Sequence, residues 1–351
     1  MDEHHLLNIA TSYLKSVVSP QSAALDRDSH ALHNALNGLG ELGLLALQVP
    51  TNWGGLAASA ATYYNFQQLV ARYSGALAFV QTQHQSAAGM LVQSQNQTLK
   101  QEYLPYLSNG KILLGVGFSH LRRQGEPIVK AHLVDGGYRL NGTVPWITGF
   151  GIFQEFIVAA TLPDDRAVFG LVPFGNSGSI TISDVLPLAA MSSTNTVTAT
   201  LNNWLLKCDR IVSIKPPGWI QQNDKQNVLK ATALALGCAL ASLDVIQATY
   251  SNKQLSFIHL AWEKLHLEVS QCRTAVDKAT HESFETKLKS RAWAIDLAVR
   301  CAQCAIAVSS GAANYNHHPA QRIYREALVY TVSGQSTDLM AATLERLTDF
   351  K

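Results

Sequence analysis

Two segments, LLGVGFSH at residues 113–120 and YRLNGTVPWITG at residues 138–149, decide the fold of this chain. Each is a short run typical of a β-strand, and each ends close to a hydroxyl side chain, Ser119 or Thr148. Glycine-containing motifs at residues 135–137 and 141–142 predict two tight turns. Trp146 and Thr148 share one strand face because alternate residues point the same way. That face is suited to stacking and hydrogen-bonding a flat heteroaromatic ring, although an ordinary half-buried sheet has the same pattern.

The character of the sequence changes twice, which predicts three parts. Residues up to about 110 carry apolar side chains at helical spacing, with breaks expected at Pro20, at residues 50–55 and at Pro105. Short Val-, Ile-, Thr- and Phe-rich runs then predict a small antiparallel sheet or barrel. The remainder predicts an up-down bundle of four helices, at residues 228–247, 257–280, 283–310 and 320–332. The predicted fold class is therefore α+β and mainly helical.

The composition argues against several functions. A net charge of +2 with 15% charged residues gives no electrostatic footprint for nucleic acid. The apolar fraction of 47% is concentrated in Ala- and Leu-rich helical patterns, which predicts helices buried on several sides, as in an oligomer. The longest apolar stretch, residues 231–246, is too short for a bilayer crossing of ~20 residues. The N-terminus also lacks the pattern of a signal peptide, so we expect no membrane span.

The cysteines and histidines predict neither disulfides nor a metal site. Five cysteines, an odd number in apolar surroundings, favour a reducing cytoplasm. Cys301 and Cys304 form a CxxC motif inside an Ala-rich helical run, without a second such motif, and we interpret them as small packed thiols. His317 and His318 are adjacent in a loop and cannot easily converge on one ion.

Further motifs follow the same order as those of a known family. They are LGELGLL at residues 39–45, VP at 49–50, GG at 54–55, KQEYLPYL at 100–107, LNGTVPWITG at 140–149, GAANYNHHP at 311–319, REA at 325–327 and GQS at 334–336. In this order the chain resembles the acyl-CoA dehydrogenase family over nearly its whole length, and it is also similar to flavin monooxygenases of the same fold. The resemblance implies an N-terminal helical domain (1–111), a middle antiparallel β domain (112–215) and a C-terminal four-helix bundle (216–351).

The resemblance also implies a binding site for FAD, with FMN as the less favoured flavin. In the family the flavin lies between the β domain and the bundle, and a neighbouring subunit completes the site. By position, Ser119 contacts the pyrimidine edge, Trp146 covers the ring and Thr148 reaches the N5 side. The implied cofactor contacts are Phe118, Ser119, Trp146, Thr148, Lys253, Gly311 and Ser336. Each has a structural alternative, since strand-end hydroxyls commonly bind local backbone groups and Trp146 could belong to the core.

The chain departs from the family at the catalytic base. The usual glutamate position is Gly334 here, preceded by Ser333, and an alternative position on the first bundle helix is Asn227. None of these can act as a general base near neutral pH. Val228 stands where the family usually has a substrate-binding arginine. The remaining candidates for proton transfer are Asp224, His84 and His120.

Three functions are therefore open. The first is a flavin-dependent oxidoreductase of the acyl-CoA dehydrogenase type, acting on CH–CH bonds of an atypical small-molecule substrate such as an acyl thioester. The second is a monooxygenase that uses reduced flavin and oxygen, with His84 or His120 assisting. The third is a non-catalytic scaffold of the same fold. The expected assembly is a homodimer or homotetramer, and the expected protein partner is an electron-transfer protein or a flavin reductase.

Overall fold

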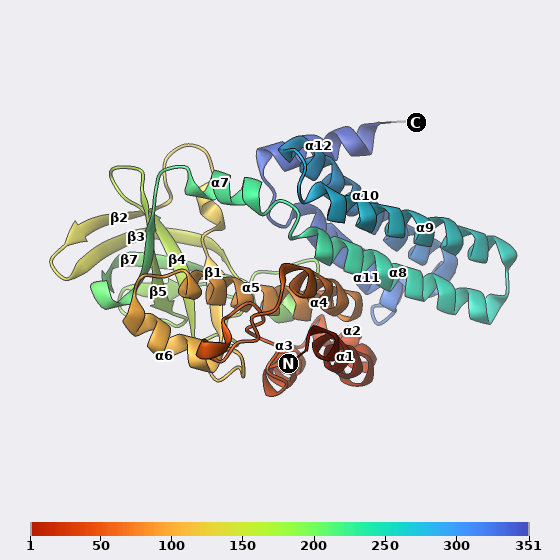
Figure 1. The fold of residues 1–351 in the computed structure, drawn as a ribbon, viewed down its shortest axis with the longest axis horizontal. Helices are drawn as coiled ribbons and strands as arrows, with labels where there is room; N and C mark the ends of the chain where they lie inside the picture. Colours follow the sequence, from red (N-terminus) through yellow and green to blue (C-terminus); the bar gives the residue numbers. More distant parts are fainter. Residues whose placement is uncertain (1, 350–351) are drawn as a thin grey trace.

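The computed structural model describes residues 2–349 and has the predicted α+β, mainly helical fold. A group of N-terminal helices lies beside an eight-stranded sheet, and a bundle of long helices extends from them along the long axis (Figure 1). One hydrophobic core includes side chains from all three parts. The element type changes between residues 107 and 114 and again between residues 215 and 219. We retain the domain boundaries at residues 111 and 215 as a proposal.

Side-chain caps start several of the N-terminal helices. Asp28, Ser59, Ser74 and Asn96 each accept a hydrogen bond from a backbone N–H two or three residues later. The elements are α1 Glu3–Tyr13, η1 Leu14–Val18, η2 Ser19–Gln21, α2 Ser22–Leu25, α3 Ser29–Glu41, η3 Thr51–Trp53, α4 Ala60–Tyr73, α5 Gly75–Val92 and α6 Gln97–Leu107. The predicted break at Pro105 is wrong, because this proline lies inside α6. Because proline has no N–H, the hydrogen bond from residue 105 to the carbonyl of Gln101 is lost, and the helix continues for only two more residues.

The sheet is largely antiparallel. Its strands are β1 Leu114–Gly117, β2 Val129–Val134, β3 Gly137–Ile147, β4 Glu155–Thr161, β5 Ala167–Pro173, β6 Ile180–Ile182, β7 Val197–Lys207 and β8 Ile211–Lys215. They follow the order β6-β7-β3-β2-β4-β5-β8. Contrary to the purely antiparallel prediction, β1 pairs with β4 in parallel, and β2 also meets β4 in parallel at one residue pair.

One of the two predicted turns is correct and the other is wrong. The turn at Asp135 and Gly136 joins β2 to β3. Asn141 and Gly142 instead lie inside β3, where the pairing with β7 shifts register. Gly142 has a φ of +130°, and a Cβ there would meet the carbonyl oxygen of Ile128. The Asn-Gly pair therefore serves a β-bulge, which needs the same conformational freedom as a hairpin turn.

The C-terminal part contains the four predicted long helices and two further ones. The elements are α7 Trp219–Gln226, α8 Thr232–Lys253, α9 Ser256–Ala279, α10 Phe284–Ser309, η7 Ser310–Asn314, α11 Pro319–Val332 and α12 Thr337–Thr348. The first long helix starts later than predicted, because turns at residues 227–231 separate α7 from α8. The missed α7 is polar and buries only Ile220, so its sequence lacks an apolar stripe.

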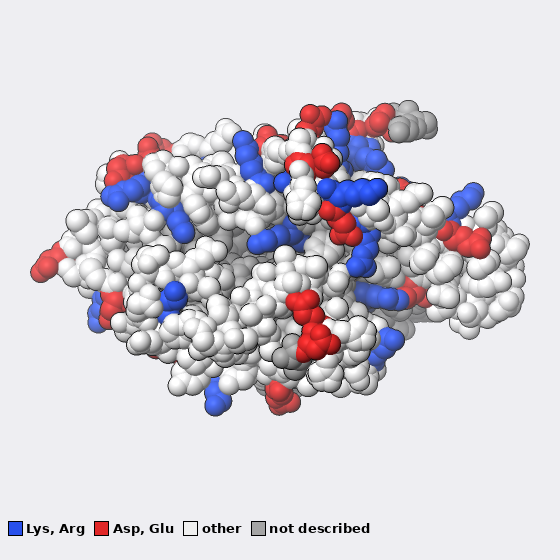
Figure 2. All heavy atoms as spheres, in the orientation of Figure 1, with Lys and Arg blue, Asp and Glu red and all other residues white. Residues whose placement is uncertain are grey.

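Two bundle helices are longer than the apolar segment 231–246, which was predicted to be too short to cross a bilayer. α8 and the continuous helical segment Phe284–Asn314 are long and apolar enough to cross a bilayer. In the most apolar 18 residues of α8, 72% of the residues are buried inside the fold. The corresponding share for Phe284–Asn314 is 56%. The prediction that the first segment is too short is therefore wrong, and its apolar character is explained by burial in the bundle. Charged side chains of both signs are interspersed over the face in Figure 2.

A buried network of charges joins the bundle to the N-terminal helices. Arg322 and Glu326 form an ion pair one turn apart on α11, and both are almost completely buried. Glu326 also accepts a hydrogen bond of 3.1 Å from the backbone N–H of Gly75, at the start of α5. Arg325 donates to Asp26 at 2.6 Å, and Asp26 is itself 1% exposed. Arg325 thus pairs with Asp26 of the N-terminal part, while its sequence neighbour Glu326 pairs with Arg322.

Candidate functional site

A cavity of about 350 Å³ lies where the sheet, the N-terminal helices and the bundle meet. Its walls come from α5, β1 and the turn after it, β3, α7, the start of α8, and α10. Residues 333 and 334, between α11 and α12, also line it. The volume is at the lower end for small-molecule sites, which span about 300–1,000 Å³. All three parts of the chain contribute to this one space.

The sheet side of the cavity carries four of the predicted cofactor contacts, Phe118, Ser119, Trp146 and Thr148. Trp146 is 49% exposed, so it is not the core residue that the alternative interpretation required. The Thr148 hydroxyl is buried and lies 3.1 Å from the hydroxyl of Thr196. Among residues 2–349, nothing hydrogen-bonds the hydroxyl of Ser119. Trp146, Thr148 and Ser119 thus present an aromatic face and two hydroxyls to one cavity.

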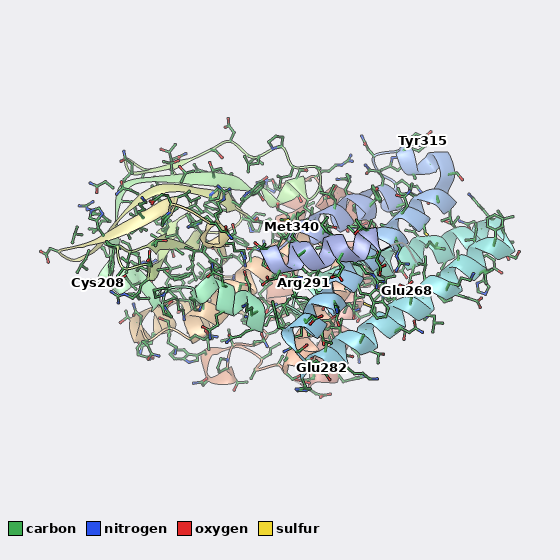
Figure 3. The ribbon with its side chains drawn as sticks, turned by 90° about the horizontal axis from the view of Figure 1, so that it is seen from above. Cys208, Glu268, Glu282, Arg291, Tyr315 and Met340 are labelled. Atoms are coloured by element: carbon green, nitrogen blue, oxygen red, sulfur yellow. The ribbon has the colours of Figure 1, made fainter. Side chains whose placement is uncertain are left out.

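The other three predicted cofactor contacts lie outside this cavity. Lys253 ends α8, and its ammonium donates to the carbonyl of Val308 at 2.8 Å. Gly311 is in η7, next to the loop of Tyr315, which Figure 3 shows at the far end of the bundle. Ser336 caps α12 by accepting from the N–H of Leu339 at 3.2 Å. One chain therefore brings together only the contacts implied for the flavin ring.

The two histidine candidates do not line the cavity. His84 is fully buried on α5, where Leu114 N–H donates to its Nδ1 at 3.0 Å and its Nε2–H donates to the carbonyl of Leu107 at 3.1 Å. His120 is 5% exposed, with its Nε2 3.0 Å from the carbonyl of Ala159. Desolvation by burial lowers the pKa of each histidine to about 4. Both are therefore neutral at physiological pH and join backbone segments.

These histidines predict that the fold weakens in acid. Each has a folded-state pKa of about 4, below its unfolded value of 6.5, so protons bind preferentially to the unfolded chain. The stabilisation is complete above pH ~6.5 and is lost as the pH falls toward ~4, at about 3 kcal/mol for each histidine. Urea unfolding across this range measures the loss. His84→Gln should flatten the dependence, and an unchanged profile in that variant would contradict the assignment.

Asp224 on α7 is the one carboxylate among the described side chains that line the cavity. Its two oxygens accept from Nε and Nη2 of Arg122, each at 2.7 Å. Such a bidentate pair holds the carboxylate in a fixed orientation. Asp224 is therefore the predicted proton-transfer residue that the structure brings to the implied ring contacts. Arg122 lies three residues after Ser119 in the sequence. Its pairing with Asp224 was not predicted.

Arg291 on α10 is a cavity residue that the sequence argument missed. It is 6% exposed, and Figure 3 shows it near the middle of the long axis. Its Nη2 donates to the carbonyl of Ser333 at 2.7 Å and approaches that of Gly334 at 3.4 Å, while Nη1 donates to the carbonyl of Val228 at 3.0 Å. Burial lowers its pKa to about 10, which leaves it charged at neutral pH. A cation thus adjoins Gly334, where the resemblance led us to look for a carboxylate.

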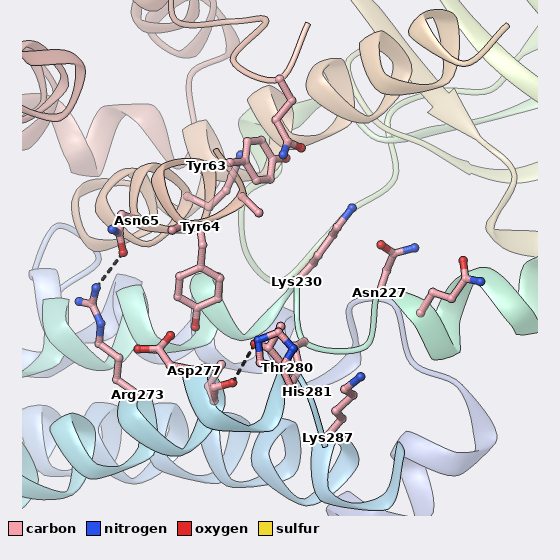
Figure 4. A pocket seen from close by; sticks show the side chains of 17 residues that line it. Tyr63, Tyr64, Asn65, Asn227, Lys230, Arg273, Asp277, Thr280, His281 and Lys287 are labelled. Carbon is pink, nitrogen blue, oxygen red and sulfur yellow. Dashed lines mark hydrogen bonds between the residues drawn. The ribbon is translucent and has the colours of Figure 1, made fainter. Parts of the chain in front are cut away.

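A second cavity, of about 600 Å³, adjoins the first and shares Asn227 and Lys230 with it. It is enclosed by α4, the α7–α8 connection, α9 and the start of α10 (Figure 4). Arg273 donates to the side-chain oxygen of Asn65 across it at 2.7 Å, and Tyr64 contributes its ring. The basic residues in its wall are Lys230, Arg273 and Lys287, with Asp277 as the acidic one. No local sequence pattern could reveal this space, because its walls come from separate elements.

No metal centre accompanies these cavities in the part of the chain that the structure describes. Within residues 2–349, no three His, Cys, Asp or Glu side chains lie close enough to hold an ion. The five cysteines are all unpaired thiols, and Cys238, Cys272 and Cys301 are buried. Burial raises the pKa of the Cys301 thiol to about 12, as expected for a packed side chain.

Comparison with known proteins shows similarity to acyl-CoA dehydrogenases. The family model for the N-terminal domain of acyl-CoA dehydrogenases matches residues 1–111. An acyl-CoA dehydrogenase of Bacillus subtilis (strain 168) is 20% identical over 341 residues, which cover 90% of each chain. The chain therefore matches this relative over nearly the full length of both.

Solved structures share the fold at low sequence identity. A glutaryl-CoA dehydrogenase from Mycobacterium smegmatis in complex with FADH2 superposes with a TM-score of 0.83 and 14% identity, covering 100% of this chain and 95% of that one. KijD3 in complex with FMN and a dTDP-linked amino sugar gives a TM-score of 0.79 and 15% identity, covering 99% and 94%. At such identities the likeness concerns the fold alone.

Proposed function

Because the chain belongs to the acyl-CoA dehydrogenase family, we propose that it is a flavin-dependent oxidoreductase acting on CH–CH bonds of an atypical acyl substrate. One observation carries the proposal: Phe118, Ser119, Trp146 and Thr148 line a single cavity together with the carboxylate of Asp224. These residues supply an aromatic surface, hydroxyls and a proton acceptor around one space. The adjoining larger cavity provides room for the remainder of an acyl thioester.

The residues of the sheet side fit the ring of a flavin. Trp146 offers a half-exposed indole, and Phe118 is held by edge-on contacts with Phe169 and Trp219 at 5.6 and 6.2 Å between ring centroids. The Ser119 hydroxyl can pair with a polar ring edge, and the Thr148 hydroxyl can do so while it keeps its contact with Thr196. When bound, a flavin supplies the acceptor for the hydride removed from the substrate. The protein's part is to hold the ring and the substrate against each other.

FAD is the proposed flavin, with FMN as the alternative. The FADH2 named for the Mycobacterium smegmatis structure supports FAD, and the FMN named for KijD3 supports the alternative. Lys253 and Gly311 are two of the three implied contacts that lie outside the cavity, and Ser336 is the third. We propose that they serve a flavin held in a neighbouring subunit's cavity, which makes FAD binding dependent on assembly. An electron-transfer protein or a flavin reductase remains the proposed protein partner, and the cytoplasm the proposed location.

The bundle has apolar side chains available for assembly, and we predict a homodimer or homotetramer. Phe257, Leu260 and Leu267 on α9 are 65%, 51% and 59% exposed. More exposed apolar side chains lie on α11 and α12: Tyr324, Leu328, Val332, Met340, Leu344 and Leu347. Apolar patches of this kind mark interaction surfaces. Light scattering after size exclusion should give two or four times 38.1 kDa. A stable monomer would contradict the prediction, and Leu267→Glu should shift the mass downward.

The ring site predicts how a tryptophan substitution affects flavin affinity. Trp146→Ala removes the half-exposed indole and should weaken FAD binding about tenfold or more, since stacking on an aromatic side chain contributes ~1–3 kcal/mol. Titration of FAD and FMN, followed by the visible flavin band and by thermal shift, measures this. Tyr106→Ala, at an exposed aromatic outside the cavity, is the matched control and should bind normally. If the wild-type protein responds to neither flavin, the scaffold function replaces the enzymatic one.

Asp224 is the proposed base for a dehydrogenation. It would accept the proton that leaves the substrate carbon, while Arg122 keeps the carboxylate oriented. Gly334 and Ser333 line the same cavity but offer no side chain for this task. Arg122 occupies one lone pair on each Asp224 oxygen, so the substrate proton would be taken on a remaining lone pair, and the protonated carboxyl would bind Arg122 more weakly. A dependence of the rate on Arg122 is therefore part of the proposal.

A monooxygenase is the second candidate, and one observation favours it. Each oxygen of Asp224, the cavity's carboxylate within the described chain, already accepts a bond from Arg122. A reaction that starts from reduced flavin and oxygen has no need of a free base. Oxygen consumption in the absence of acyl-CoA, measured in excess of that of the same flavin reductase and reduced flavin without the protein, distinguishes the two. The positions of His84 and His120 outside the cavity give this route no direct help from either histidine.

A further inference from the structure

Arg291 is a buried cation without an acidic partner. Its three hydrogen-bond contacts are all to backbone carbonyls, those of Val228, Ser333 and Gly334. No carboxylate lies within ion-pair distance of it among residues 2–349. Burying a charge without a counter-charge is costly, and buried arginines are usually paired. The charge of Arg291 therefore needs an explanation outside the chain's own ion pairs.

The guanidinium has donors to spare, and it faces a cavity. A guanidinium has five N–H groups, and the three carbonyl contacts leave two of them free. Arg291 is among the residues that line the smaller cavity. The free donors are the N–H of Nε and one N–H of Nη1, and each of them can donate to an oxygen of a carboxylate. An anionic group in the cavity would supply the missing partner.

The charged residues in the cavity wall also favour an anionic ligand. Its wall contains Arg122, Lys230 and Arg291 as cations and Asp224 as the anion, so three positive charges face one negative charge. Asp224 is already bound through both oxygens to Arg122. The charged side chains of the cavity wall therefore carry a net charge of +2. A neutral acyl chain makes no use of this charge.

Gly334 leaves room for an anion beside the guanidinium. A Cβ atom placed on Gly334 would lie 3.4 Å from Nη2 of Arg291, with no closer heavy atom of the protein. We propose, resting on the oxidoreductase function above, that the substrate carries a free carboxylate and that Arg291 binds it beside Gly334. The substrate class is then a carboxylated acyl thioester, with the carboxylate as a second recognition point.

The test compares the binding of succinyl-CoA and glutaryl-CoA with that of their carboxamide analogues. Calorimetry on the full-length protein, with and without FAD, should show at least one carboxylate binding about 10- to 100-fold more tightly than its carboxamide. Arg291→Gln should abolish the preference, and Arg291→Lys should retain part of it. Circular dichroism and melting temperature establish whether each variant is folded.

Gly334 provides a second variant that keeps the arginine. Gly334→Glu places a tethered carboxylate beside Arg291 and should abolish the preference, whereas Gly334→Ala, which has the same backbone strain at a φ of +59°, should retain it. Equal affinities in the wild-type protein, binding of none of the four compounds, or displacement of the carboxylate compound by inorganic phosphate at equal concentration would overturn the proposal. Failure to bind any flavin would instead defeat the oxidoreductase function, because the preference is measured also without FAD.

Discussion

Glu326→Ala is expected to lower the free energy of unfolding by about 3–5 kcal/mol, because it leaves the buried guanidinium of Arg322 without its partner. The substitution also removes the acceptor for the backbone N–H of Gly75, which joins α11 to α5. Urea unfolding at neutral pH measures the change. The contact lies between the bundle and the N-terminal helices, so we also expect a less cooperative transition.

Two further variants show whether burial is the cause. Glu285 and Lys289 form an ion pair with the same one-turn spacing on α10, but both are exposed, so Glu285→Ala should leave the stability nearly unchanged. The double variant Arg322→Met/Glu326→Leu should recover most of the loss, since apolar side chains of similar volume replace buried ion pairs at little cost. A loss below about 1 kcal/mol in Glu326→Ala would contradict the account.

Asp224→Asn is expected to lower the rate of flavin reduction by an acyl thioester by about 10²–10⁴-fold, because the amide cannot accept the substrate proton. Single-turnover mixing of the FAD-loaded protein with substrate under anaerobic conditions measures this rate. FAD affinity should change little, since Asp224 is not among the implied ring contacts. Arg122→Lys should give a smaller loss, because an ammonium cannot hold both carboxylate oxygens in one fork.

The chain contains a matched control for the loss of an arginine–aspartate pair. Arg72 and Asp244 form the same two-bond arrangement, at 2.7 and 2.5 Å, away from the cavity. Asp244→Asn should therefore have the wild-type rate of flavin reduction. If Asp224→Asn reduces flavin as quickly as Asp244→Asn, then Asp224 is a structural residue and another group takes the proton.

The sheet side of the site could be predicted because its signal is local. Alternation along one strand placed Trp146 and Thr148 on a shared face, and both line the cavity together with Ser119. The same local reasoning failed at Asn141 and Gly142, because a bulge and a hairpin turn require the same backbone freedom. Only the strand pairing distinguishes the two, and pairing is not a local property.

The bundle side could not be predicted in the same way. Arg291 contacts the carbonyls of Val228 and Ser333, which lie 63 and 42 residues from it in the sequence. The one sequence feature that marks Arg291 is its charge in an alanine-containing helical segment. That feature does not predict which backbone carbonyls its side chain contacts. His84 was predicted from the sequence as a site residue, but it does not line the cavity. It is completely buried and hydrogen-bonds the backbone of Leu107 and Leu114. Tertiary packing decided both outcomes.

Anaerobic addition of acyl thioesters to the FAD-loaded protein tests the central claim most directly. The cavity's aromatic face, its hydroxyls and Asp224 together predict that at least one compound, carboxylated ones foremost, bleaches the visible flavin band without any added reductant. Dithionite, added last, serves as the control that the bound flavin can be reduced. A flavin that stays oxidised with every neutral and carboxylated acyl thioester, and is then bleached by dithionite, would contradict the assignment of this protein as an acyl-oxidising flavoenzyme.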